Sequence, residues 1–102
     1  MTKIYISMPM AGMSISDILR KRADHAKNAA KIAGLYDAET VIVDSLVPDA
    51  DKLDPLVCLA RSIEAMATAN IVYFAAGWDS ARGCRIEHEC AVAYGKTVIE
   101  ET

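Results

Sequence analysis

Residues 71–87 read IVYFAAGWDSARGCRIE, and this stretch decides the predicted fold. Its first six residues are apolar and include β-branched and aromatic side chains, which is typical of a buried strand that stops at Gly77. After the loop, apolar residues recur at helical spacing as far as Tyr94. Gly95 follows, at a position where a helix C-terminus favours glycine. The stretch therefore predicts a buried strand, a glycine-containing loop and a helix.

Glu87 has an unusual place in the predicted helix. On a wheel at 100° per residue it falls on the apolar arc, beside Cys90, Ala91 and Tyr94. A carboxylate there is either paired or held ready for chemistry. It also lies about one turn from the helix N-terminus, where unbonded N–H groups favour anions. If Glu87 is structural, it pairs with Arg82 or caps a neighbouring loop.

The rest of the chain alternates between strands and helices. A strand over 3–7 is stopped by a loop over 8–12, and Ser14 with Asp17 starts a helix that Gly34 ends. A second strand covers 40–44, a loop covers 48–53, and Asp54-Pro55 fits the start of a second helix. The third strand spans 70–76, and a last short strand spans 97–99.

This β-α-β-α-β-α-β order predicts a parallel sheet covered on both faces. We expect one domain over residues 1–102, with a flavodoxin/Rossmann-like three-layer α/β/α fold and about four to five strands. Such folds bind ligands beyond the C-terminal ends of the strands, near the switch in strand order.

Composition excludes several classes of function. The net charge of −3 and pI near 5.2 argue against binding of a nucleic-acid polymer. No apolar run approaches the roughly 18–20 residues of a membrane span, and the N-terminus resembles a strand rather than a signal peptide. For Cys58, Cys84 and Cys90 the simplest interpretation is reduced, buried thiols of a cytoplasmic protein. Cys84 and His88 have a spacing that suits two metal ligands, but without further ligands no metal site is predicted.

The rule on strand ends brings three loops to one cleft. The expected substrate-binding residues are Ser7, Met8, Pro9, Met10, Gly12, Ser45, Gly77, Trp78, Ser80, Arg82 and Gly83. Arg82, Ser80 and the helix N–H groups could hold a phosphate, or Arg82 could pair with Asp79 or Glu87. Trp78 could stack on a base or simply pack, and the Pro9–Gly12 segment could approach a ligand or form a tight turn.

Two motifs carry a family resemblance. The pattern Gly83-x-x-x-Glu87-x-x-x-Ala91-x-x-x-Gly95-Lys96 resembles the G-x-x-x-E-x-x-x-A-x-x-x-G-K run of the nucleoside 2-deoxyribosyltransferase superfamily. Residues 77–89, with the Y-I-S-x-P-M-x-G run over 5–12, look still closer to a short, mostly phage-encoded, DUF4406-like branch. The resemblance covers nearly the whole chain and implies the same flavodoxin-like sheet.

The resemblance also implies roles for particular residues. Glu87 matches the nucleophile that attacks the anomeric carbon of the sugar, and Tyr5 matches a strand tyrosine near that sugar. Well-studied transferases have an aspartate six residues before the glutamate, where this chain has Ala81. Asp79 is then the candidate general acid, or a contact to a ribose hydroxyl.

The resulting expectation is cleavage or transfer of the N-glycosidic bond of a (deoxy)nucleoside or nucleotide. Glu87 forms a glycosyl ester, which water then hydrolyses or a second base attacks. This chemistry requires no metal or organic cofactor. The resemblance implies a homodimer or larger homo-oligomer, because neighbouring subunits complete superfamily sites. Two alternatives stay open, namely a non-catalytic nucleotide-binding module of phage type that uses the same cleft, and a small interaction protein with a vestigial cleft.

Overall fold

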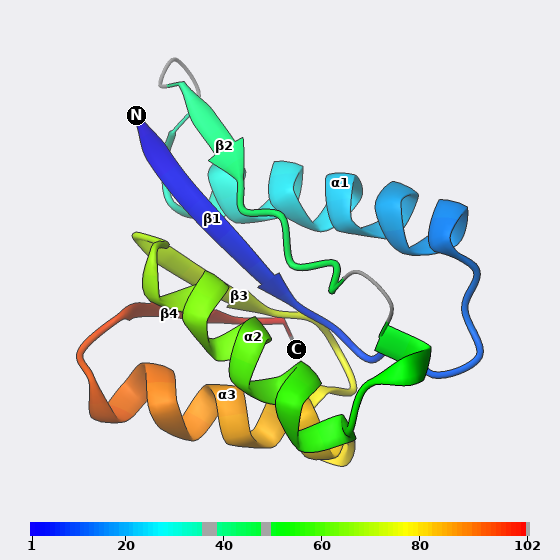
Figure 1. Cartoon of the computed structure of the whole chain (residues 1–102). Helices are drawn as coiled ribbons and strands as arrows, with labels where there is room; N and C mark the ends of the chain where they lie inside the picture. Colours follow the sequence, from blue (N-terminus) through cyan, green and yellow to red (C-terminus); the bar gives the residue numbers. More distant parts are fainter. Residues whose placement is uncertain (36–38, 48–49, 102) are drawn as a thin grey trace.

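The structure is a computed structural model that describes residues 1–35, 39–47 and 50–101. Strands β1 (Thr2–Ser7), β2 (Thr40–Ile42), β3 (Ile71–Phe74) and β4 (Thr97–Glu100) form a parallel sheet in the order β2-β1-β3-β4 (Figure 1). This is the order of the first four strands in a flavodoxin-like sheet, whose switch point lies between β1 and β3. The predicted small α/β, Rossmann-like fold is confirmed.

Helices cover both faces of this sheet. Helix α1 (Ile15–Ile32) lies on one face, and α2 (Pro55–Ala67) and α3 (Arg82–Ala93) lie on the other (Figure 1). Side chains alternate along β1, so Ile4 and Ile6 pack with α1 while Tyr5 packs with Met66 of α2. The alternation explains why strands that are buried on both faces are almost continuously apolar.

The predicted helix starts are confirmed by their caps. Ser14 Oγ accepts a hydrogen bond from Asp17 N at 3.2 Å, and Asp54 Oδ1 accepts one from Leu56 N at 2.8 Å. These side chains satisfy N–H groups that have no partner within the helix. At the other end of α3, Gly95 has a φ of 72°, as a glycine after a helix C-terminus commonly does.

Several sequence expectations need correction. The strands predicted over 40–44 and 70–76 are shorter, at Thr40–Ile42 and Ile71–Phe74, because β2 pairs with β1 over three residues and β3 turns into the loop at Ala75. Of the loop predicted over 48–53, residues 48 and 49 lie outside the described residues, and Ala50–Lys52 forms a short 3₁₀ helix.

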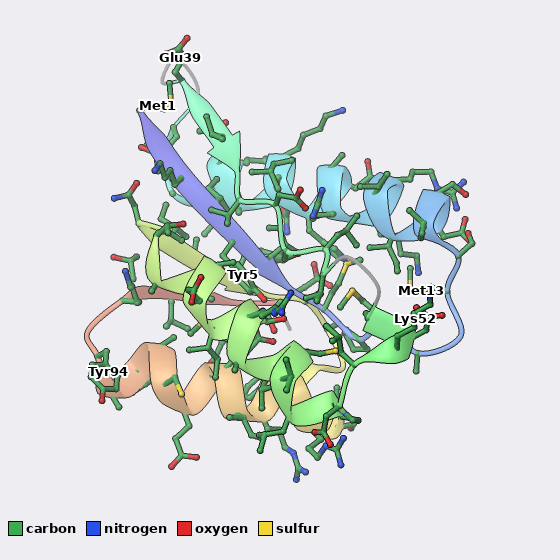
Figure 2. All side chains as sticks on the ribbon, in the orientation of Figure 1. Met1, Tyr5, Met13, Glu39, Lys52 and Tyr94 are labelled. Atoms are coloured by element: carbon green, nitrogen blue, oxygen red, sulfur yellow. The ribbon has the colours of Figure 1, made fainter. Side chains whose placement is uncertain are left out.

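The predicted apolar faces of α1 and α3 are also only partly buried. Ile15, in the first turn of α1, is 67% exposed, while Ala29 is fully buried in the cluster that includes Ile4 and Ile6 of β1. The start of α1 extends past the end of β1 (Figure 1). Tyr94 is 85% exposed at the end of α3 and points away from the sheet (Figure 2). A helical wheel gives the direction of a side chain but not whether a strand lies beneath it.

Candidate functional site

A cleft of about 580 Å³ opens beside the C-terminal ends of β1 and β3. Three segments line it: the loop after β1 at Met8–Met10, the start of α2 between Asp54 and Ser62, and the start of α3 between Ala81 and Glu87. The volume is within the range of small-molecule sites, and apolar side chains dominate the wall, with a few polar groups among them. The location agrees with the predicted switch point.

Glu87 is the buried carboxylate of this cleft. It is 7% exposed, and its Oε1 accepts a hydrogen bond from Ser7 Oγ at 3.3 Å. Its Oε2 is buried and has no hydrogen-bond partner among the described residues. Burial raises the pKa of Glu87, and the nearby hydroxyl groups of Tyr5 and Ser7 oppose that rise. One carboxylate oxygen is therefore hydrogen-bonded to Ser7, whereas the other is buried without a hydrogen bond among the described residues, although the Tyr5 hydroxyl lies near the carboxylate.

Two residues of β1, Tyr5 and Ser7, place their hydroxyl groups near the Glu87 carboxylate. Tyr5 and Ser7 lie two apart on β1, so both face α2 and α3, and each is 2% exposed. Figure 2 shows Tyr5 between β1 and α2. Burial, and then the charge of Glu87, raises the pKa of the Tyr5 phenol, which therefore stays protonated and remains a donor.

Cys84 lies one turn before Glu87 and also lines the cleft. Burial raises the pKa of its thiol, with a further contribution from the Glu87 charge, while the Ser7 hydroxyl opposes the rise. The protonated thiol is a poor nucleophile. All three cysteines are free, but Cys58 and Cys90 are only half-buried rather than buried.

Arg82 lines the cleft without pairing with the residues that the sequence suggested. No ion pair joins it to Asp79 or to Glu87 in the described part of the chain. Its side chain is exposed, and the residue that precedes α3, Ala81, provides no side-chain cap. The pairing of Arg82 with Glu87 that the sequence suggested is therefore not formed, and the pKa of Glu87 is raised overall.

The structure brings only part of the predicted site together. Six predicted residues line the cleft: Met8, Pro9, Met10, Arg82, Gly83 and Glu87. Tyr5 and Ser7 adjoin it through Glu87. Six others are absent from its described lining: Gly12, Ser45, Gly77, Trp78, Asp79 and Ser80.

Residues 77–80, between β3 and α3, do not belong to the described lining of the cleft. Trp78 begins a short 3₁₀ helix, Trp78–Ser80, which includes Asp79. The indole stacks on His88, with the ring centroids 4.1 Å apart and an angle of 12° between the ring planes, and it also packs against Phe74. Trp78 is therefore a packing residue here, which was one of the two readings of the sequence. Gly77 has a φ of 90° and lies against Pro9, so it shapes the turn without lining the cleft.

Ser45 belongs to the opposite side of the sheet. Its Oγ accepts a hydrogen bond from Arg22 Nη1 at 3.3 Å, and the same guanidinium lies 3.5 Å from Asp44 Oδ1. Arg22 extends from α1, and its side chain is only 12% exposed. The strand-end rule places a residue at the correct edge, but it does not choose between the two faces of the sheet.

Sequence reasoning missed the contribution of α2. Leu56, Cys58, Leu59 and Ser62 line the cleft together with the capping residue Asp54. A signal was present, because Asp54-Pro55 marks a helix start on the chain that leaves the C-terminal end of β2. In a parallel α/β fold such a start lies at the same edge as the other helix N-termini.

Two further features bear on the kind of site. Within the residues that the structure describes, no group of three or more His, Cys, Asp and Glu side chains could hold a metal ion. Among these same residues, no helix combines the length and apolar character that crossing a bilayer requires. The polar groups in the described lining are the buried carboxylate of Glu87, the exposed carboxylate of Asp54, the hydroxyl group of Ser62 and the exposed guanidinium of Arg82.

Fold and cleft together define a small α/β protein with a four-stranded parallel sheet and a cleft at its C-terminal edge that is lined by a buried carboxylate. A family model described as "Domain of unknown function (DUF4406)" matches residues 2–100, and the chain belongs to this family. No curated protein and no solved structure matches the chain. The family match confirms the narrower resemblance of the motifs, and it does not name a wider superfamily.

Proposed function

We propose that this protein cleaves or transfers the N-glycosidic bond of a (deoxy)nucleoside or nucleotide, with Glu87 as the nucleophile. The observation that carries the proposal is Glu87 Oε2, which is buried beside the cleft without a partner among the described residues. Leaving a buried polar atom unpaired costs about 1–3 kcal/mol, and more for a charged group. A carboxylate with only a structural role would be expected to have donors for both oxygens.

The proposed chemistry uses the free oxygen. Glu87 Oε2 attacks the anomeric carbon as the bond to the base breaks, and the base leaves with the bonding electrons and takes up a proton from water. The positive charge that builds on the sugar is stabilised by the carboxylate beneath it. Water then attacks the glycosyl ester to complete hydrolysis, or a second base attacks it to complete transfer. Either step returns Glu87 to its free form.

The surrounding hydroxyl groups suit this role. Ser7 donates to Oε1, which fixes the carboxylate and leaves Oε2 free to react. Tyr5 and Ser7 oppose the rise in the pKa of Glu87 that burial causes, and so favour the ionised form that a nucleophile needs. The motif around Glu87 and Tyr5 supports the same assignment, since it resembles that of the nucleoside 2-deoxyribosyltransferase superfamily.

The assembly is part of the proposal. Large apolar side chains are exposed at the cleft, with Leu56 at 72%, Met10 at 43% and Ile86 at 36%. Exposed apolar groups beside a site are typical of a surface that a partner covers. We therefore include a homodimer or larger homo-oligomer that is joined near the cleft, as the superfamily resemblance implies.

The test is a panel of nucleosides, nucleotides and dinucleotides, with release of the free base followed by chromatography. Glu87→Gln keeps the shape of the side chain and removes the nucleophile, so turnover should fall by about three or more powers of ten. Glu89→Gln is the matched control, because this glutamate is exposed on the same helix. A Glu87→Gln protein with wild-type turnover would refute the role of Glu87.

A second candidate is a nucleotide-binding module without catalysis. One observation favours it: Asp79, the acid expected from the sequence, is absent from the described lining of the cleft. Without a general acid, departure of the base is harder. Recovery of a bound nucleotide unchanged, together with no release of base from any member of the panel, would support this candidate over the enzyme.

A further inference from the structure

The cleft contains a second carboxylate that the motifs did not indicate. Among the described residues that line it, only Glu87 and Asp54 carry carboxylate groups. Asp54 comes from the start of α2, whereas Glu87 comes from α3, so the two acids belong to different segments of the cleft wall. Unlike Glu87, Asp54 is exposed.

The capping hydrogen bond of Asp54 determines how its carboxylate can interact with a ligand. Its Oδ1 accepts a hydrogen bond from Leu56 N at 2.8 Å as the N-cap of α2, which fixes the position of the side chain. A capping carboxylate is held as an acceptor, and the positive end of the helix dipole favours its negative charge. Its second oxygen, Oδ2, has no hydrogen bond within the described residues. Asp54 therefore offers an oriented acceptor rather than a proton donor.

We infer that Asp54 binds the substrate by accepting a hydrogen bond from an O–H or N–H group of the nucleoside, and that it thereby determines specificity. The inference rests on the proposed function, because it takes the cleft to be a nucleoside site. A nucleoside has such donors in its sugar hydroxyls and on the base edges that bear N–H groups. An ionised acceptor discriminates strongly, because a ligand that lacks the donor leaves a desolvated charge without a partner.

The role of Asp54 is distinct from that of Glu87. Glu87 is buried beside the reacting centre and reacts through an unpaired oxygen, whereas Asp54 is exposed and already in use as a cap. Removal of the Asp54 charge should therefore weaken binding more than it slows the chemical step. Removal of Glu87 should do the opposite.

Two substitutions separate the binding role from the capping role. Asn and Ser both serve well as N-caps, so Asp54→Asn and Asp54→Ser should leave α2 and the Tm close to wild type. Asn removes the charge, and Ser also removes the reach of the side chain. Asp51→Asn is the matched control, because Asp51 is exposed three residues earlier and is absent from the described cleft lining.

The experiment measures affinity by calorimetry in a Glu87→Gln background, where turnover cannot interfere. The probes are the common ribonucleosides, their 2′-deoxy counterparts, purine riboside and the 5′-monophosphates. For the tightest probe, Asp54→Asn should raise the Kd by about 10- to 100-fold, and Asp51→Asn should change it less than about twofold. With Glu87 intact, KM should rise while kcat changes by less than about threefold.

Each outcome has a meaning. If the loss is confined to ribonucleosides, Asp54 binds the 2′-hydroxyl; if it is confined to bases that bear an exocyclic amine, Asp54 binds the base. An unchanged Kd in Asp54→Asn, or a fall in kcat at constant KM, overturns the inference while the proposed function stands. If no probe binds the Glu87→Gln protein or is turned over by the wild type, the proposed function fails, and the inference fails with it.

Discussion

Glu87 carries an energetic cost that follows from its place on α3. Burial raises the pKa of this carboxyl group, so the ionised form is less stable in the folded protein than in the unfolded chain. The folded protein then binds more protons than the unfolded chain between the two pKa values. Stability is therefore lost as the pH rises from the unfolded pKa through the folded one.

The substitution Glu87→Gln should accordingly stabilise the fold at neutral pH. We expect a gain on the order of 1 kcal/mol, which for a domain of this size raises Tm by about 4–8 °C. The gain should disappear at pH values below the pKa of glutamate in the unfolded chain, because the glutamate of the wild type is then as neutral as the glutamine of the variant. Calorimetric melting at several pH values measures it, and a mutant less stable than wild type at neutral pH would contradict the account.

Arg82 tests whether the cleft recognises a phosphate. Its guanidinium is exposed beside the uncapped start of α3 and forms no ion pair with the described residues. If it binds a phosphate, Arg82→Ala should weaken nucleotide binding by about 1.5–3 kcal/mol and hardly change nucleoside binding. Arg85→Ala, on the same helix but outside the described lining, is the control. Equal losses for both ligands would assign Arg82 to the fold instead.

At the level of helices and strands, some residues of the motif that runs from Gly83 to Lys96 have structural roles. Ala91 is fully buried against the sheet, where a larger side chain would not fit. Lys96 follows Gly95 and donates from Nζ to the carbonyl oxygens of Ala67 at 2.8 Å and Ala69 at 2.9 Å. This cation at the C-terminal end of α2 joins the start of β4 to that helix.

Lys96→Met should therefore destabilise the fold without affecting the cleft. The loss should be about 1–2 kcal/mol, the scale of a partly exposed hydrogen bond from a charged group. Lys21→Met on the exposed surface of α1 is the control and should change stability by less than about 0.5 kcal/mol. Urea unfolding measures both variants. A Lys96→Met protein as stable as the control would show that these two hydrogen bonds contribute nothing net.

The same elements show how far the sequence could predict the structure. Strand–helix alternation, the caps at Ser14 and Asp54 and the burial of Glu87 were all predictable, because each depends on local spacing. The sequence could not predict which face of the sheet a loop residue reaches, because that depends on how the helices pack. Ser45 therefore lies with α1 and Trp78 against His88, whereas α2 contributes a wall that no motif indicated.

At the scale of the whole molecule, the cleft is open and bordered by apolar side chains. The chain has a mass of 11.0 kDa and a Cα radius of gyration of 12.9 Å. A stable homodimer generally buries about 1,200–2,000 Å² of surface, and the exposed Leu56 and Ile86 near the cleft would contribute to such an interface. Closure of the cleft by a second copy would also exclude water from the glycosyl ester.

We therefore expect solution scattering at tens of micromolar to give at least about twice the mass of one chain. Leu56→Lys should shift the protein towards the monomer, because it places a charge on the expected interface. Lys52→Met, a substitution of an exposed residue outside the described cleft lining, should leave the mass unchanged. A monomeric mass for the wild type at these concentrations would contradict an oligomer joined near the cleft.

The most direct test of the central claim is to trap the covalent intermediate. A 2-fluoro-2-deoxyribosyl nucleoside should react with the wild-type protein and release its base, because fluorine slows the second step and lets the glycosyl ester accumulate. Peptide mass spectrometry should then find one added sugar on the peptide that contains Glu87, and none in the Glu87→Gln protein. An adduct on Asp54 or Asp79, or turnover that persists in Glu87→Gln, would contradict Glu87 as the nucleophile.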